Sequence, residues 1–222
     1  MNIIKKFDIL LGLPKSIILN FKYLKFREAV KLPILVSRKV KFKMLRGRIK
    51  IESKIKTGMI QIGLDNIDIF EKNKINNVWK VEGKIIFKGK AILKNGVKVN
   101  VAKSGELILG KNILINNQTS IVCNKKVTIG DNSLVSWECL IMDTDFHKIE
   151  NQSGKIINHD KEISISDNVW IGCRATILKG SIIGDNSVIA SNSVVCSELV
   201  DSNNIYGGNP AKKIKSDINW RV

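Results

Sequence analysis

A single histidine, His147, stands in the segment IMDTDFHKI (residues 141–149), and the 222-residue chain has only one other. Two carboxylates, Asp143 and Asp145, precede it at spacings of four and two residues. A neutral imidazole accepts a proton near neutral pH and can return it, so this group suits general base chemistry. Asp145 and Asp143 would orient the ring or bind a polar substrate, or they would merely turn a corner of the chain. His147 and Asp145 are therefore candidate catalytic residues, and Asp143 is a candidate substrate-binding residue.

Two other kinds of chemistry are disfavoured by the residues present. A zinc site made of three histidines cannot form from His147 and His159 alone, and we expect no metal and a solvent-exposed His159. A covalent acyl-cysteine is not favoured either, because no histidine lies near a cysteine in the sequence. No CxxC pair and no secretory signal are seen, so we expect reduced thiols and a cytoplasmic location for the four cysteines, Cys123, Cys139, Cys173 and Cys196.

Aliphatic residues recur every six positions over much of the chain. The series is unbroken at Ile165, Ile171, Ile177, Ile183, Ile189 and Val195, and small residues usually follow four positions later. A helix has a period of about 3.6 and a simple strand about 2, so neither fits. A hexapeptide period is typical of a parallel β-helix, in which three short strands and three corners make one coil. Gly, Asn and Asp at the remaining positions tolerate the positive φ of tight corners.

The six-residue phase fails around His147. Ile141 is followed four residues later by Asp145, and then comes HKIENQSGKIINHDKE, a polar run without interior residues. This pattern predicts a loop that leaves the prism at about residues 143–164. Because loops on rigid scaffolds often carry function, the break strengthens the case for His147.

The net charge of +17 is concentrated in the N-terminal quarter. Residues 1–56 hold 16 of the 37 basic residues and three of the 20 acidic ones, a net +13 against +4 for the rest. Such a charge would attract a membrane surface, a polyanionic glycan or a nucleic acid, or it is simply a solvated face. Aromatic and aliphatic residues lie among these lysines, which favours a membrane surface as partner; packing on the first coil with exposed charge is the alternative. No motif of nucleic-acid binding accompanies the charge.

The most regular segments resemble a known family. NVWIGCRATILKGSIIGDNSVIASNSVV, followed by GGNPAKKI, is similar to the C-terminal half of the left-handed β-helix acyltransferases with hexapeptide repeats. WECLIMDTDFH resembles the subgroup that O-acetylates sugars of capsules and lipopolysaccharides. The resemblance, over about residues 58–215, implies an all-β fold, a left-handed parallel β-helix. It also implies transfer of an acetyl group from acetyl-coenzyme A to a sugar hydroxyl.

On the acceptor side, the resemblance gives His147 the part of general base. A sugar hydroxyl attacks a thioester poorly unless its proton is removed, and such a base contributes roughly 10²–10⁴ in rate. Asn116 falls where sugar acetyltransferases of this family place an asparagine that lines the acceptor pocket. It would bond a hydroxyl or the developing oxyanion; a plain corner asparagine in INNQ is the equal alternative.

On the donor side, the resemblance places acyl-coenzyme A along the prism. Its pantetheine arm would meet backbone amides at Gly172, Cys173 and Ser191, whose small side chains permit close approach. Ordinary corner residues would have the same identities. Lys212 and Lys215 match basic positions that meet the cofactor phosphates as point charges. The family often has arginine there, which puts bidentate phosphate contacts in doubt.

Three parts of the chain follow from these observations. Residues 1–56 form a basic N-terminal segment, 57–205 the β-helix catalytic domain, and 206–222 a C-terminal segment that contacts the cofactor. The resemblance further implies a homotrimer with active sites between prisms. Two other functions stay open: a non-catalytic β-helix adaptor that binds membrane or anionic polymer, and N-acetylation of an amino-sugar nucleotide. The expected location is the cytoplasm, with a peripheral contact at the inner face of the membrane.

Overall fold

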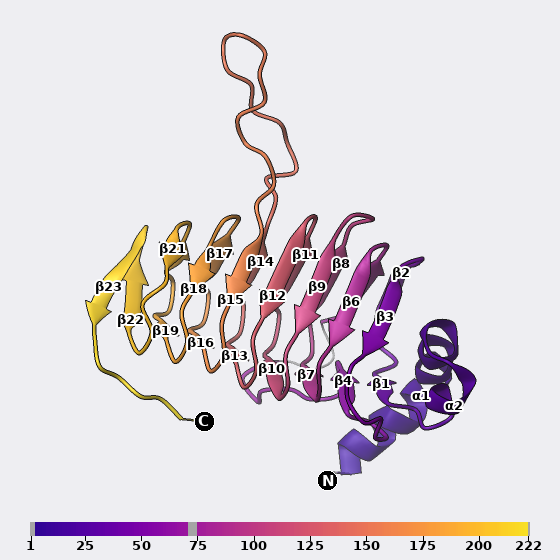
Figure 1. The fold of residues 1–222 in the computed structure, drawn as a ribbon. Helices are drawn as coiled ribbons and strands as arrows, with labels where there is room; N and C mark the ends of the chain where they lie inside the picture. Colours follow the sequence, from indigo (N-terminus) through magenta and orange to yellow (C-terminus); the bar gives the residue numbers. More distant parts are fainter. Residues whose placement is uncertain (1–2, 71–74, 222) are drawn as a thin grey trace.

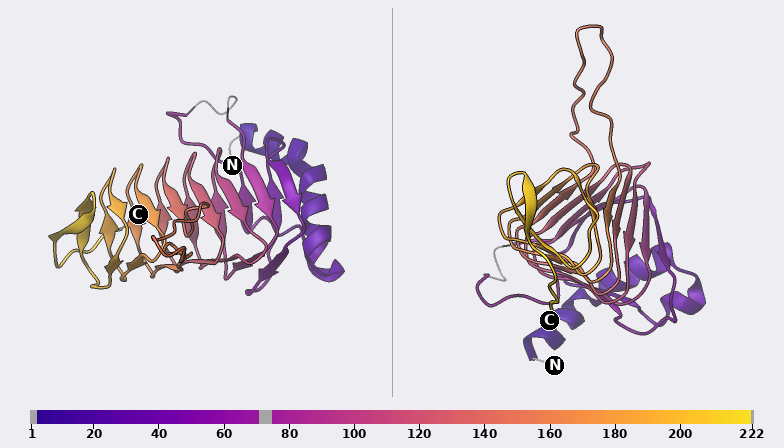
Figure 2. Two further views of the ribbon diagram at one scale, coloured as in Figure 1. Left: turned by 90° about the horizontal axis from the view of Figure 1, so that it is seen from above. Right: turned by 60° about the vertical axis from the view of Figure 1, so that its left-hand side comes forward.

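A prism of stacked coils forms the body of the protein, and one helix lies across its N-terminal end (Figures 1 and 2). The computed structural model describes residues 3–70 and 75–221. Each complete coil contributes one strand to each of three sheets. Among the described strands, only the hairpin of β22 and β23 pairs in antiparallel fashion. The chain is thus a parallel β-helix.

The first sheet has nine strands, the other two seven. The first sheet holds β1 (Ile34–Val36), β4 (Ile60–Ile62), β7 (Ala91–Leu93), β10 (Ile113–Ile115), β13 (Leu134–Val135), β16 (Trp170–Ile171), β19 (Val188–Ile189), β22 (Ile205–Gly208) and β23 (Ala211–Lys215). The second holds β2 (Lys41–Leu45), β5 (Val78–Val81), β8 (Lys98–Val101), β11 (Ser120–Cys123), β14 (Leu140–Met142), β17 (Thr176–Leu178) and β20 (Val194–Val195). The third holds β3 (Arg48–Ile51), β6 (Lys84–Phe87), β9 (Glu106–Leu109), β12 (Lys126–Ile129), β15 (Ile163–Ile165), β18 (Ile182–Ile183) and β21 (Glu198–Leu199).

Three corners join these sheets. The first corner connects the first sheet to the second, the second corner connects the second to the third, and the third corner leads to the next coil. At the third corner, aspartate carboxylates accept backbone N–H groups from the preceding coil. Asp131 accepts from Lys111 at 2.8 Å, and Asp167 accepts from Asp131 at 2.7 Å. These bonds satisfy amides that a sharp corner would otherwise leave unpaired.

The interior of the prism is filled by the six-residue series. Its members lie in stacked columns, as Val135, Ile171 and Ile189 do in the first sheet. All six residues of the series from Ile165 to Val195 have at most 1% of their surface exposed. The predicted hexapeptide β-helix is therefore confirmed, because the spacing of the aliphatics is the spacing of the interior positions.

Helix α1 (Ile3–Tyr23) closes the N-terminal end of the prism, and the short α2 (Phe26–Ala29) follows it. The buried Asn20 donates to the carbonyl of Ile34 at 2.7 Å and accepts its N–H at 3.1 Å. The hydroxyl of Ser16 accepts the N–H of Val36 at 3.0 Å. The exposed edge of β1 thus receives side-chain partners in place of another strand. No described helix is long and apolar enough to cross a bilayer.

The β-helix begins earlier than the expected boundary at residue 57. Strands β1, β2 and β3 lie within residues 34–51 and form the first coil, with Ile34, Val36 and Val40 wholly buried. The hexad spacing is hidden here because β2 and β3 alternate exposed basic residues with apolar residues that are less exposed, which reads as a simple strand pattern. A register shift between Phe42 and Met44 also breaks the phase. Much of the N-terminal charge therefore belongs to the outer surface of coil 1.

Candidate active site

The predicted excursion leaves the prism between β14 and β15, at residues 143–162, and projects far beyond the second corner (Figure 1). We call this segment the arm. Its two sides run antiparallel, with a bridge between Glu150 and Ile156 and a bond from the Ile157 N–H to the Ile149 carbonyl at 2.9 Å. The residues of the arm are mostly polar and its few apolar residues lack the six-residue spacing, so the segment cannot continue the interior columns of the prism.

His147 is exposed at the root of the arm, in a cleft of about 260 Å³ that Asn124, His159 and Asp160 also line. Its backbone is held on both sides. The N–H donates to the Asp145 carbonyl at 2.7 Å, and the carbonyl accepts from Asn158 Nδ2 at 2.8 Å. The imidazole is therefore open to a substrate while its backbone is fixed, which is the arrangement that a general base needs.

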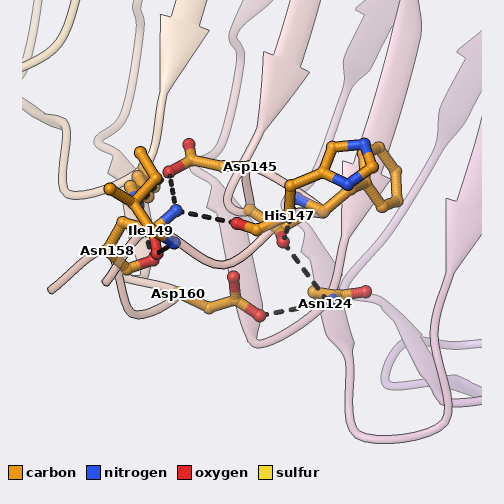
Figure 3. Close-up of polar contacts among 9 residues, drawn as sticks. Asn124, Asp145, His147, Ile149, Asn158 and Asp160 are labelled. Atoms are coloured by element: carbon orange, nitrogen blue, oxygen red, sulfur yellow. Dashed lines mark hydrogen bonds and ion pairs between the residues drawn. The ribbon is translucent and has the colours of Figure 1, made fainter. Parts of the chain in front are cut away.

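Asp145 does not orient the imidazole, in contrast to one expectation from the sequence. Lys179 Nζ donates to its Oδ2 at 2.5 Å and Asn158 Nδ2 donates to the same oxygen at 2.8 Å. The ring of His147 points away from this carboxylate (Figure 3). The bonds from Lys179 and then Asn158 hold the pKa of the Asp145 carboxyl below its usual value. Asp145 is thus connected to the backbone of His147 through Asn158, which suits a positioning residue and not a direct partner of the ring.

Asp143 is wholly buried, and its carboxylate is occupied by the backbone. Oδ1 accepts the N–H of Asn124 at 2.6 Å, and Oδ2 accepts those of Lys125 and Lys126 at 2.8 Å each. A carboxylate surrounded in this way supports the corner below the arm and has no exposed oxygen for a sugar. Of the two roles that the sequence left open for Asp143, the geometry favours the corner.

Asn158 is a residue of this site that the sequence analysis missed. Its Oδ1 accepts the N–H of Ile149 at 2.7 Å, while its Nδ2 serves both Asp145 and His147. Figure 3 shows it at the centre of these contacts. An asparagine within a polar run carries no periodic signal, so only the folded arm reveals its part.

Four other candidates lie at the first corner, away from His147. Gly172 and Asn116 directly follow strands of the first sheet, in one column two coils apart. Cys173 Sγ lies 3.3 Å from Ser191 Oγ on the next coil. A Cβ on Gly172 would come within 2.7 Å of the Ser191 nitrogen, so the glycine is required by coil stacking. Asn116 is buried, and its Oδ1 has no hydrogen-bond partner among the described residues.

A second loop, which the sequence did not predict, covers part of the first corner. It joins β4 to β5, and its described parts are residues 63–70 and 75–77. Asn117 Nδ2 donates to Asn66 Oδ1 at 2.6 Å, and the Phe70 ring meets Trp137 edge-on at 6.5 Å between centroids. Lys5 of α1 also pairs with Asp65 at 2.7 Å. The loop therefore lies beside Asn116 and connects this corner to α1.

Lys212 and Lys215 lie on β23, which pairs with β22 at the C-terminal end of the prism. Both side chains are exposed and form no ion pair within the described part of the chain, whereas the neighbouring Lys213 pairs with Asp201 at 3.1 Å. Two cations in this state are available to an anionic ligand. The expected segment boundary at residue 206 falls inside β22.

The buried cysteines are poor nucleophiles. Burial raises the pKa of Cys123 to about 12 and that of Cys139 to about 11, so both thiols stay protonated near neutral pH. Within residues 3–70 and 75–221, no group of three His, Cys, Asp or Glu side chains is placed to hold a metal ion. The exposed imidazole of His147 is a better candidate for the chemistry than either of these two buried thiols.

Comparisons with known proteins agree with this architecture. Residues 162–197 match the bacterial transferase hexapeptide (six repeats) family. An uncharacterized 24.8 kDa protein from the cps region of Klebsiella pneumoniae is 34% identical over 201 residues, which are 90% of this chain and 87% of that protein.

A polysialic acid O-acetyltransferase of Neisseria meningitidis is 37% identical over 114 residues, or 51% of this chain, and the match spans only 53% of that enzyme. The crystal structure of the polySia-specific acetyltransferase NeuO superposes with a TM-score of 0.64 at 24% identity, over 86% of this chain and 79% of that one. This likeness confirms the fold class, a left-handed parallel β-helix. As the resemblance predicted, the chain belongs to the hexapeptide-repeat acyltransferase family.

Proposed function

We propose that the protein transfers an acetyl group from acetyl-coenzyme A to a sugar hydroxyl of a capsular, lipopolysaccharide or related glycan, or of its precursor. The observation that carries this proposal is the placement of His147. Its imidazole is open to a cleft at the root of the arm, while Asn158 and the Asp145 carbonyl hold its backbone. The sugar O-acetyltransferases among the chain's relatives support the choice of reaction.

The reaction needs one proton carrier. The imidazole of His147 accepts the proton of the sugar hydroxyl as that oxygen attacks the carbonyl carbon of the thioester. The new C–O bond forms, the C–S bond breaks, and the coenzyme A sulfur leaves as a thiolate. The imidazolium then returns the proton to the sulfur, so the enzyme ends unchanged. In this step Asn116 is the proposed donor to the acceptor hydroxyl or to the oxyanion.

The donor would lie along the C-terminal coils. Cys173 is half-buried and Ser191 is exposed, so the corner at these residues would offer backbone to the pantetheine arm, and the unpaired Lys212 and Lys215 suit the phosphates. Gly172 is buried and its N–H donates to the Ile189 carbonyl at 2.8 Å, so its part would be to allow close approach.

A homotrimer would join the two halves of the site. Asn116 and the proposed donor positions lie at the first corner, whereas His147 lies beyond the second corner of the same chain. A neighbouring prism would bring its first corner to this arm. The exposed apolar side chains of the arm, Phe146, Ile149 and Ile157, support such a contact, because they have 53–60% of their surface uncovered.

A peripheral membrane contact, from the cytoplasmic side, is the remaining part of the proposal. One face of α1 packs on coil 1, and its outer face exposes Phe7, Leu10, Ile18 and Phe21 by 45–63%. Lysines flank this apolar stripe. An amphipathic helix of this kind binds anionic bilayers by burying its apolar face while its cations meet the headgroups.

The test of the proposed reaction uses the full chain with acetyl-coenzyme A and a panel of neutral, acidic and amino-sugar oligosaccharides. Thiol release should depend on the acceptor, and an O-acetylated product should form. Replacement His147→Ala should lower turnover by roughly 10²–10⁴ while acetyl-coenzyme A still binds. The matched variant His159→Ala removes the other imidazole of the same cleft, and its turnover should stay near that of the wild type.

Other results would favour another function. A His147→Ala variant that keeps half of the turnover would remove His147 from the mechanism. Acetylation of amines alone would assign an N-acetyltransferase. Absence of acceptor-dependent thiol release across the panel would favour the non-catalytic adaptor.

A further inference from the structure

A groove of about 600 Å³ runs along the second corner from coil 1 to coil 4. Its lining residues belong to the second corner, the edge of the prism from which the arm rises (Figure 1). We call it the basic groove, because six of its lining residues are cationic and only three, Glu82, Glu106 and Glu162, are acidic. The cations are Arg46, Arg48, Lys84, Lys103, Lys125 and Lys126.

Three of these six cations have acidic partners within the described part of the fold and three do not. Lys125 and Lys126 lie 3.8 and 3.7 Å from the carboxylate of Glu162. Arg48 and Lys84 are register partners on adjacent strands, and like charges placed opposite each other in a sheet are destabilising. Lys84 pairs with Glu106 at 2.6 Å. Among the described residues, Arg46, Arg48 and Lys103 form no ion pair, and all three are exposed. The groove therefore keeps positive charge that an anionic ligand would neutralise.

The floor of the basic groove is backbone. Gly47, Gly83 and Gly105 follow one another at the corner, and a Cβ on any of them would come within 2.3 Å of a carbonyl oxygen of the next coil. Only glycine fits such close stacking. These three corner positions therefore carry no side chain, and one groove spans the coils.

The lining residues restrict the class of ligand. None of them is aromatic, so nucleobases would find no stacking partner. None is aliphatic either, so neither a lipid chain nor an apolar protein surface would be accommodated. Arginine and lysine heads beside exposed backbone suit hydrophilic carboxylates, which arginine binds in bidentate fashion. A carboxylate-bearing sugar chain has this chemistry.

The basic groove leads to the His147 cleft. Its last coil contributes Lys125 and Lys126, and the preceding residue, Asn124, lines the cleft. The buried carboxylate of Asp143 accepts the N–H groups of all three residues and so fixes the groove's end relative to the root of the arm. A chain lying in the groove would present its end or a middle unit to the imidazole.

We infer that the acceptor is an acidic, carboxylate-bearing oligo- or polysaccharide, held along the second corner of coils 1 to 4 by the basic groove. This inference rests on the proposed function, since it names the acceptor class of that same site.

The experiment measures binding by calorimetry with the full-length protein and without acetyl-coenzyme A. The probes are oligomers of sialic acid and of galacturonic acid, each beside its carboxyl-reduced counterpart. The groove variant carries Arg46→Gln, Arg48→Gln and Lys103→Gln. The control variant carries Lys54→Gln, Lys56→Gln and Lys90→Gln, exposed lysines at the third corner without ion pairs in the described structure. Both variants lose the same net charge.

At least one acidic oligomer should bind more tightly than its reduced counterpart, with an affinity that falls as salt is added. The groove variant should weaken that binding about tenfold, and the control variant should leave it near wild type. Equal binding of acidic and reduced oligomers, or of none, would overturn the inference. So would equal loss in the two variants, because net charge alone would then explain it.

Binding of the oligomers and transfer of the acetyl group are measured separately, so the acceptor class and the reaction can fail independently. If acidic oligomers bind in the groove but no acetyl transfer occurs, the proposed function fails and the binding site stands. If acetyl transfer occurs on neutral sugars and the groove variant is unaffected, the reaction stands and the acceptor class is wrong.

Discussion

The imidazole of His147 owes its position to groups that never touch it. Lys179 is only 18% exposed and holds Asp145, Asp145 holds Asn158, and Asn158 holds the His147 carbonyl. This series of contacts fixes the position of the His147 backbone and leaves the ring, which points into the cleft, without a direct partner among the described residues. Misplacing a catalytic group by about 1 Å can cost roughly a hundredfold in rate, so the far end of this series should matter for turnover.

Replacement Lys179→Met tests this chain of contacts. Turnover should fall roughly ten- to a hundredfold, while the affinity for acetyl-coenzyme A stays the same. The matched variant Lys148→Met removes an exposed lysine of the arm that forms no ion pair in the described structure, and should leave turnover near wild type. Equal turnover in Lys179→Met and wild type would reduce the Lys179–Asp145 pair to a surface contact.

The same pair gives a pH dependence that a purely catalytic assay would miss. Because the pKa of Asp145 is lowered in the folded protein, its carboxylate stabilises the arm above the usual value of 3.8. This contribution is lost as the pH falls through the lowered pKa. In Lys179→Met the pKa of the Asp145 carboxyl should move back up toward its usual value. Asn158 connects Asp145 to the Ile149 amide, so hydrogen exchange at that amide should accelerate at a higher pH than in the wild type.

At the scale of elements, the sequence predicts what repeats and misses what does not. The aliphatic hexads from Ile165 to Val195 predict coils because every interior position has the same environment. The arm is predicted by the failure of that period. The sequence does not predict coil 1, the capping helix or the loop beside Asn117. Each of these depends on contacts between distant segments, such as Asn20 with Ile34. Asp143 was ambiguous for the same reason.

The packing of α1 and coil 1 on the rest of the prism limits how the membrane contact can be tested. A chain that begins at residue 57 would lose coil 1 and expose the core, so point substitutions are needed. Phe7→Gln, Leu10→Gln and Phe21→Gln on the outer face should lower partitioning into phosphatidylglycerol vesicles by roughly tenfold or more.

A control with Ile69→Gln, Val200→Gln and Ile214→Gln removes equally exposed apolar side chains elsewhere, and should bind as wild type does. Co-sedimentation reports both variants. If wild type and the α1 variant bind anionic vesicles equally, or neither binds, α1 is only the cap of the prism.

For the whole molecule, the separation of the two corners predicts that one chain alone is incomplete. His147 stands beyond the second corner and Asn116 lies at the first. Under the proposed function, a complete site would combine the arm of one copy with the first corner of the next. In a cyclic trimer, each interface pairs these two different surfaces, and every copy contributes once to each of two sites.

Mixing two inactive variants tests this arrangement. His147→Ala and Asn116→Ala homotrimers should each lose turnover. When they are unfolded and reassembled together in equal amounts, about a quarter of the sites should combine an intact His147 from one copy with an intact Asn116 from its neighbour. Activity should return toward that fraction of wild type. Sedimentation velocity and native mass spectrometry verify that mixed trimers have formed, and wild-type protein taken through the same cycle corrects for losses. Verified mixed trimers that stay inactive would place both residues in a site within one chain, whereas monomers with full wild-type turnover would make the neighbouring prism unnecessary.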